Sequence, residues 1–246
     1  MHPSHTNTPE LSKESETFDI PAFLKVLNKP ENLARFQGDE YVRTITPEQV
    51  VALTKIDKES MSTSDFHAYS SAFIQTEKIT KHPGYDLFQH RDYHTLRYMT
   101  YRFDKDSALV VVKEFNGKGM IRSKYLAFYG KEPVGIGYEY DDNGKFLREV
   151  DYDKGYTFKY DQVLEYFQKE CTSLYSGHPS THPDTPHFIR HGVEAGRKIW
   201  YINYYEGPDF FIHALDGQTG KAFVSQKLNR DTGELKSGAE YIPEDE

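Results

Sequence analysis

The chain has 246 residues but a single cysteine, Cys171, so it cannot form an internal disulfide or a four-cysteine zinc site. It contains no apolar run near the ~18 residues that a membrane-spanning helix needs. Its first residues, MHPSHTNTPELSKESET, lack the basic and apolar regions of a signal peptide. We therefore expect a cytoplasmic protein, or a periplasmic one if a leader has been removed.

Positive charge is also scarce. Lys and Arg together number 30 against 38 Asp and Glu, which gives a formal net charge of −8 and a pI near 5.8. Nucleic acids and anionic membranes both select basic faces, so we expect neither as a partner. A protein partner with a basic surface suits this balance, because opposite charges speed association.

Aromatic residues are plentiful although hydrophobic residues as a whole are not. Hydrophobic residues make up 37% of the chain and aromatic residues 15%, with 19 Tyr and 16 Phe. Rings bury large areas, so they can build a core in place of Leu and Ile. A disordered chain would be poor in them, so most of this chain should fold.

The first third of the chain carries helical patterns. Residues 1–16 are polar and rich in Ser, Thr and Pro, which predicts a flexible tail. Apolar residues then recur at helical spacing in three segments, 17–29, 45–57 and 64–78. The second has the clearest start signal, because the threonine of the pair at 46–47 can cap it and the proline suits a first turn.

From about residue 85 to 155 the pattern changes to the alternation of β-strands. SALVVVKEF is a β-branched run typical of a buried strand, and turn sequences follow at short intervals. The Asn-Gly pairs at 116–117 and 143–144 predict tight hairpins with positive φ at both central residues. The segment should therefore form an antiparallel meander.

The last third combines a helix with strands. An amphipathic helix should begin near Asp161, and three strands follow it, in HFIRHGVEA, RKIWYINYYEG and DFFIHALDGQTGKAFVSQ. The sequence thus predicts an α+β fold: N-terminal helices packed on a mainly antiparallel β-sheet of hairpins, followed by a helix plus three-strand module. Residues 17–155 and 156–246 form two parts, or one compact domain.

One local pattern resembles a known repeat family. The segment 138–155 is similar to the hairpin unit of bacterial MORN-like repeat proteins, in which an aromatic strand leads to Asn-Gly-Lys and a second strand. The matching residues are Tyr138, Tyr140, Asn143, Gly144 and Lys145. The sequence FNGK at 115–118 resembles a degenerate copy of the same unit.

A second pattern resembles PepSY-like proteins. Residues 156–226 are similar to their helix-plus-strands module, and share the Trp-Tyr-Ile of 200–202 and the Asp-Gly-x-Thr-Gly of 216–220. Together, the two patterns resemble uncharacterised proteins of Bacteroidetes-type bacteria, some of which are immunity partners of polymorphic or type VI toxins. The resemblance implies a non-enzymatic immunity protein, without a cofactor, that binds a cognate toxin and occludes its active site. Many members carry an export leader, and this sequence departs from them there.

The strand RKIWYINYYEG is the strongest candidate for a contact surface. If the alternating set that begins with Trp200 faces the core, Tyr201 and Tyr205 lie on the other face, and tyrosines are common in interfaces. A sheet with both faces covered is the alternative. Acidic side chains would meet the basic surface of the toxin. The predicted toxin-binding set is Tyr201, Tyr205, Glu206, Asp209, Asp141 and Asp142.

An enzyme is the rival hypothesis. Residues 178–191 hold four of the eleven histidines, and His182, His187 and His191 have spacings that zinc sites use. Three prolines interrupt the segment, so no helix presents these side chains, and a stiff connector is the other interpretation. The alternatives to an immunity protein are a metal-dependent hydrolase built on this cluster and an envelope-associated structural module. We assign no catalytic residue, because no reaction signature is present.

Overall fold

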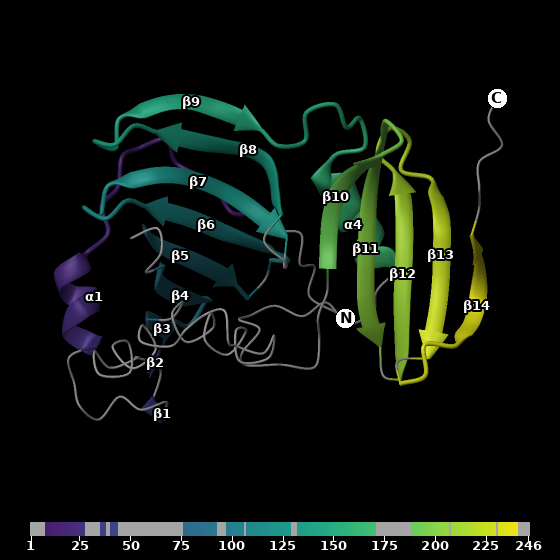
Figure 1. Cartoon of the computed structure of the whole chain (residues 1–246), viewed down its shortest axis with the longest axis horizontal. Helices are drawn as coiled ribbons and strands as arrows, with labels where there is room; N and C mark the ends of the chain where they lie inside the picture. The colour runs from purple at the N-terminus through teal and green to yellow at the C-terminus, as the bar shows by residue number, and fades with distance from the viewer. Residues whose placement is uncertain are drawn as a thin grey trace, which may run out of the picture.

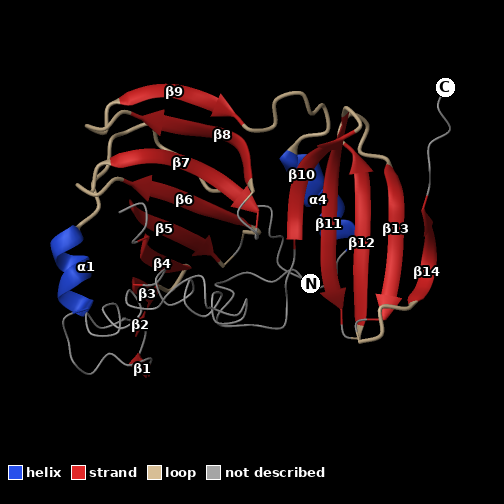
Figure 2. Cartoon of the chain, in the orientation of Figure 1, coloured by secondary structure: helices blue, strands red, loops and turns tan. Residues whose placement is uncertain are grey.

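Two antiparallel sheets make up most of the structure (Figures 1 and 2). The structure is a computed structural model of the chain. It describes residues 8–27, 35–37, 40–43, 76–92, 97–105, 107–128, 132–170, 188–206, 208–229 and 231–240. The first sheet has nine strands and the second has five, and within each sheet every strand pairs with the next one along the chain. The described part of each sheet is therefore a meander without a crossover.

Most strands are short and follow one another closely, although residues 44–75 separate β2 from β3. The first sheet contains β1 Arg35–Gln37, β2 Glu40–Arg43, β3 Thr76–Lys81, β4 Tyr85–Asp92, β5 Arg97–Asp104, β6 Leu109–Phe115, β7 Ile121–Phe128, β8 Pro133–Tyr140 and β9 Phe146–Asp151. The second contains β10 Phe188–Glu194, β11 Arg197–Glu206, β12 Asp209–Asp216, β13 Ala222–Asn229 and β14 Leu235–Glu240. The helices among the described residues are α1 Ile20–Leu27 and α4 Tyr160–Glu170.

The described chain is predominantly β, which corrects the predicted share of N-terminal helices. Helix α1 confirms the first predicted helix, whereas residues 45–57 lie outside the described residues. The last three residues of the predicted helix 64–78 belong instead to strand β3. Ile79 in that strand is 1% exposed and lies opposite Phe88 of β4, so burial within the sheet outweighs the local helical pattern.

The Asn-Gly hairpins form, but with a longer turn than predicted. In the β8–β9 turn, Asp141 N–H donates to Lys145 O, and Gly144 alone has a positive φ, of 77°. In the β6–β7 turn the positive φ, of 80°, falls on Gly119 and not on Gly117. Both are three-residue loops that end in a glycine in the left-handed region. The prediction of two positive φ values per turn is wrong. The side chain just before each loop, Asp141 or Asn116, accepts the N–H groups two and four residues onward and so stabilises the longer form.

The C-terminal module has five strands, two more than predicted. Its helix α4 begins within one residue of the expected start, but residues 209–226 fold into two strands and β14 follows. The turns on either side of β13 share one chemistry. Asp216 Oδ1 and Asn229 Oδ1 each accept N–H groups two and three residues onward, and Gly220 and Gly233 both have a φ of 71°. The second copy of this turn closes a hairpin where the sequence had indicated a turn alone.

Residues 8–16, part of the segment predicted as a flexible tail, run along one face of the first sheet, and in Figure 1 their trace passes behind β7 to β9. Lys124 of β7 is fully buried beneath them. Its ammonium donates to the carbonyls of Ser12, at 3.0 Å, and Glu14, and pairs with the Glu16 carboxylate at 2.6 Å. A buried ammonium needs all three of its donors partnered, so these contacts give the segment a defined course.

The charge of Glu16 is also fixed by this arrangement. Burial alone would raise the pKa of its carboxyl, but hydrogen bonds from Lys113 and Lys124 outweigh burial, and the pKa is lowered. Next along the chain, the Asp19 carboxylate caps α1 by accepting the Ala22 N–H at 2.9 Å. Aromatic rings then close this end of the sheet in one buried cluster of Phe18, Phe23, Tyr98, Phe115, Ile121 and Tyr140.

A single buried cluster joins the two sheets. It contains Leu109, Val111, Leu126, Phe128 and Val134 of the first sheet, Val163, Leu164 and Phe167 of α4, and Ile189, Trp200, Ile202, Tyr204 and Leu215 of the second. Trp200 has no exposed surface and meets the Phe128 ring edge-on, with 6.3 Å between centroids. His191 Nε2 lies 3.0 Å from Pro133 O, which adds a polar contact between the sheets. Residues before and after 156 thus share this core.

Gly220 and Gly233 offer a matched test of how tightly Phe158 packs on the second sheet. A Cβ at either glycine meets the same backbone strain, about 1–2 kcal/mol. At Gly220 it would also lie 2.3 Å from the Phe158 ring, whereas at Gly233 nothing lies within 4 Å. We expect Gly220→Ala to lower the free energy of unfolding by about 1–3 kcal/mol more than Gly233→Ala. Urea denaturation measures the difference, and equal losses would contradict the tight packing.

Candidate functional site

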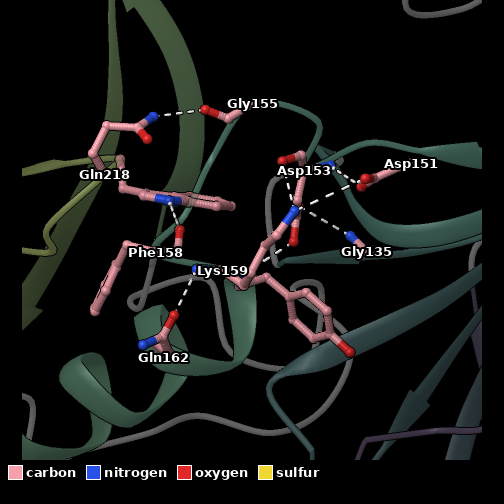
Figure 3. A network of polar contacts seen from close by, with 10 residues as sticks. Gly135, Asp151, Asp153, Gly155, Phe158, Lys159, Gln162 and Gln218 are labelled. Carbon is pink, nitrogen blue, oxygen red and sulfur yellow. Dashed lines mark hydrogen bonds and ion pairs between the residues drawn. The ribbon is translucent and has the colours of Figure 1, made fainter.

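The chain between β9 and α4, residues 152–159, connects the two sheets, and we call it the junction segment (Figure 3). Asp153 is its buried residue, with 1% exposure. Its Oδ1 accepts the Gly135 N–H of β8 at 3.1 Å, and its Oδ2 accepts the Tyr160 N–H at 3.3 Å. One carboxylate therefore fixes the start of α4 to the first sheet, and its charge suits a helix N-terminus.

The same segment is hydrogen-bonded to the second sheet. The Gly217 carbonyl accepts the N–H groups of Thr157 and Phe158, both at 3.0 Å. Trp200 Nε1 donates to Phe158 O at 2.9 Å, and Gln218 Nε2 donates to Gly155 O at 2.6 Å (Figure 3). With bonds to both sheets, the junction segment holds the adjoining surface in a fixed shape.

An open pocket of about 400 Å³ lies beside the junction segment, where β8, the start of α4 and residues 8–11 meet. We call it the junction pocket. Its apolar lining includes Leu11, Leu126 and Ile136, and Ile136 is 44% exposed although it lies in the middle of a strand. The rings of Tyr138 and Tyr160 also line it. The pocket therefore has apolar and aromatic walls.

The charged groups of the junction pocket are three carboxylates and one ammonium, those of Asp151, Asp153, Asp161 and Lys159. Both carboxylate oxygens of Asp153 already accept hydrogen bonds within the fold. Asp151 Oδ1 accepts the Asp153 N–H at 3.0 Å, but the nearest described partner of its Oδ2 is the Lys159 ammonium at 3.9 Å. Asp161 is exposed and makes no hydrogen bond or ion pair with the described residues. The pocket thus carries a net negative charge with two carboxylates open to a ligand.

The second sheet has one face against α4 and one that no described element covers. The set that begins with Trp200 faces α4 and the shared core, which is the first of the two arrangements considered from the sequence. Tyr201 and Tyr205 lie on the other face, where they are half-buried. In Figure 1, α4 lies behind the sheet and this other face is toward the viewer. We call it the tyrosine face and define it as Arg190, Tyr201, Asn203, Tyr205, Phe210 and Ile212.

Contacts within the tyrosine face hold its rings in place. The Arg190 guanidinium lies 4.7 Å from the centroid of the Tyr201 ring, and Tyr205 stacks on Phe210 with 4.6 Å between centroids. Burial, and then the carboxylate of Glu194, raise the pKa of Tyr201 to about 12. Its phenol is therefore a hydrogen-bond donor throughout the physiological pH range.

The acidic members of the predicted set lie elsewhere. Asp209 is on the α4 side of the second sheet, where hydrogen bonds from Lys227, at 2.8 Å, and Lys236 lower its pKa. Glu206 ends β11 and lies opposite Asp209, and its side chain falls outside the described part of the chain. The Asp209 carboxylate is thus already neutralised by two lysines.

The other two acidic residues stand at the β8–β9 turn, at the end of the first sheet away from the second (Figure 1). Asp141 accepts the N–H groups of Lys145 and Asn143, which lower its pKa. The Asp142 carboxylate is 87% exposed and pairs with Arg122. The structure therefore distributes the predicted set over three separate places and leaves the two tyrosines together.

The histidine cluster is described only at its end. His182 and His187 lie outside the described residues. The His191 ring packs between Tyr156 and Trp200, with 5.3 and 5.2 Å between centroids, and its Nε2 faces Pro133 O. Within the described ranges, no group of three or more His, Cys, Asp or Glu is placed to hold a metal. His191 thus has a packing role between the two sheets.

Sequence reasoning missed the junction pocket. The first turn of α4 follows Lys159, which is not a capping residue, and the carboxylate that bonds it comes from Asp153, outside the window of local capping patterns. No local pattern places Gly135 beside Asp153 either. The available signal was the density of acidic residues around the predicted helix start.

No protein-family model matches the chain, and neither a curated protein nor a solved structure does. Among the helices that the structure describes, none is long and apolar enough to cross a membrane.

A buried histidine, His213, lies where α4 meets the second sheet. It is 5% exposed, its Nδ1 lies 3.0 Å from the Tyr166 hydroxyl, and its ring stacks on Tyr204. Burial lowers the pKa of His213, and the opposing effect of the Glu170 carboxylate is smaller. The imidazole is therefore neutral in the folded protein at neutral pH.

We expect acid to weaken the fold through His213. Its ordinary pKa is 6.5 and its folded pKa is lower, so below pH 6.5 the unfolded chain binds a proton that the folded chain does not. The stability that depends on neutral His213 is complete above pH 6.5 and is lost as pH falls from there toward the folded pKa. Urea denaturation at several pH values should show a steeper loss for the wild type than for His213→Gln. Parallel curves would rule His213 out as the group responsible.

Proposed function

We propose that this chain is a non-enzymatic bacterial immunity protein, which binds a cognate type VI or polymorphic toxin and occludes its active site. The observation that best supports a binding role is the tyrosine face. Tyr201, Tyr205 and Phe210 stand on a sheet face that no described element covers. Aromatic side chains are enriched in protein interfaces. The resemblance to MORN-like and PepSY-like proteins supplies the toxin as the partner.

The tyrosine face is suited to binding because its rings are already held. Tyr201 is fixed by Arg190, and Tyr205 by Phe210. A side chain that is ordered before binding loses little rotamer freedom when the partner arrives. The strands beneath are also rigid, since β11 pairs along its length with β10 and β12. The partner would therefore meet a preformed surface.

The charge of the chain supports a basic partner. The net charge of −8 would steer a positively charged toxin toward it and raise the association rate, more so at low salt. Charge of this kind acts at long range, so it does not require Asp209 or Asp141, whose carboxylates have internal partners, to be contact residues. Affinity at short range would come from the rings.

The proposed function is tested by co-purification followed by a toxicity assay. Tagged full-length protein is used to capture a stoichiometric partner from the native cells, and the partner gene is then expressed alone and together with this chain. Arrest of growth by the partner alone, relieved by co-expression, is the expected result. A partner that is harmless alone, or whose toxicity this chain leaves unchanged, would contradict an immunity role.

Tyr201→Ala should weaken the complex with that partner by roughly tenfold or more, the effect of removing an interface hot spot. Val193→Ala is the matched control. Val193 is 57% exposed on the opposite face of the same sheet, so its removal should leave the affinity within about twofold. Calorimetric titration of the purified variants gives both values, and thermal unfolding shows that each is folded. Equal affinities for the two variants would place the contact surface elsewhere.

A further inference from the structure

The junction pocket is a second concave surface, separate from the tyrosine face. It is open, its walls combine apolar side chains with two tyrosine rings, and its charged groups are three carboxylates against one ammonium. Concave sites that bind ligands have this composition, a mainly apolar lining with a few placed polar groups.

The charged side chains of the pocket suit a cation better than an anion. Of the N–H groups at the start of α4 that an anion could use, that of Tyr160 already donates to Asp153 and that of Lys159 to Gln162. The Lys159 ammonium is also engaged, since it donates to Asp153 O at 2.9 Å and faces Asp151 (Figure 3). Among the charged side chains of the pocket, those that remain for a ligand are the carboxylates.

Two of these carboxylates have acceptor capacity to spare. Asp151 Oδ2 has the Lys159 ammonium at 3.9 Å, beyond hydrogen-bond distance, as its nearest described partner. Asp161 has no described hydrogen bond or ion pair and lies in the first turn of α4. A ligand with several N–H donors in one plane can meet two carboxylates at once.

The aromatic walls favour a planar cation. The Tyr138 ring already meets one positive charge, the Lys13 ammonium at 5.7 Å from its centroid, so a second cation would share this ring or stack on Tyr160. A guanidinium stacks on aromatic rings and forms two parallel hydrogen bonds with one carboxylate. An ammonium is less suited to such bidentate bonding. Ile136 and Leu11 offer apolar contact to the methylene stem that carries the group.

We propose that the junction pocket binds a guanidinium group on a short aliphatic stem, held by Asp151 and Asp161 and stacked against the tyrosine rings. The group can come from an arginine side chain of a protein or from a free guanidine compound, and the chemistry is shared. This proposal does not depend on the immunity role of the tyrosine face, because the two surfaces have no residue in common.

The test is a titration of the full chain followed by the amide NMR signals of Gly135 and Tyr160. The first probe is the peptide acetyl-Gly-Arg-Gly-amide, the second is the same peptide with citrulline, which keeps the shape but loses the charge, and the third is agmatine. We expect saturable shifts with the arginine peptide and binding that is weaker by roughly tenfold or more with citrulline, the effect of losing a charge-assisted hydrogen bond. Agmatine binding equally well would identify a free guanidine compound as the source, and agmatine binding less well would identify a protein side chain.

Matched variants locate the binding. Asp161 is exposed, so Asp161→Asn should leave the fold intact. Asp151→Asn keeps a side-chain oxygen that can accept the Asp153 N–H. Each should weaken the binding of the arginine peptide by roughly tenfold. Asp231→Asn, an exposed carboxylate at the β13–β14 turn, makes the same change in net charge and should have no effect. The proposal is overturned if the peptide causes no saturable shift, if citrulline binds as tightly, if inorganic phosphate binds instead, or if the three variants behave alike.

Discussion

The buried carboxylate of Asp153 determines where the second half of the chain can lie relative to the first. Its two oxygens accept N–H groups from β8 and from the first turn of α4. Without it, the buried Gly135 N–H would be unpaired, at a cost of about 1–3 kcal/mol, and the partly buried Tyr160 N–H would lose its partner as well. Since α4 then supplies Val163 and Phe167 to the shared core, the direction in which the helix starts fixes the direction in which the second sheet packs.

The interactions that orient the second sheet differ from those that stabilise its packing on the first. The hydrogen bonds of the junction segment are few, but they are specific about geometry, because each needs its donor and acceptor in line. The free energy comes mainly from the rings and aliphatic side chains around Trp200, which have no other place to be buried. The hydrogen bonds of the junction segment and the packing of the core meet at Gly217. Its carbonyl accepts two of these bonds, and a Cβ there would lie 2.7 Å from the Tyr156 ring and 2.8 Å from Lys198.

Local patterns in the sequence predicted those features of the fold that depend on residues close together along the chain. The alternation of β11, the start of α4 and the hairpin positions are of this kind, and each follows from side-chain period or turn chemistry. The turn type at Asn143 was not predictable in this way, because a side-chain hydrogen bond selects it. Strand β3 was not predictable either, because burial in the sheet decides between helix and strand there. The junction pocket was least predictable, since Gly135, Asp153 and Leu11 meet only in the folded chain.

The two candidate surfaces lie on opposite sides of the second sheet. The junction pocket is on the side of α4, because Tyr160 and Asp161 of that helix line it, and the tyrosine face is on the other side. The edge strand β10 packs against the first sheet, where His191 Nε2 lies 3.0 Å from Pro133 O. The tyrosine face has the rings for a broad contact, whereas the pocket has room and charge for one side chain. Substitutions at one surface should therefore leave binding at the other unchanged, as expected for sites that share no residue.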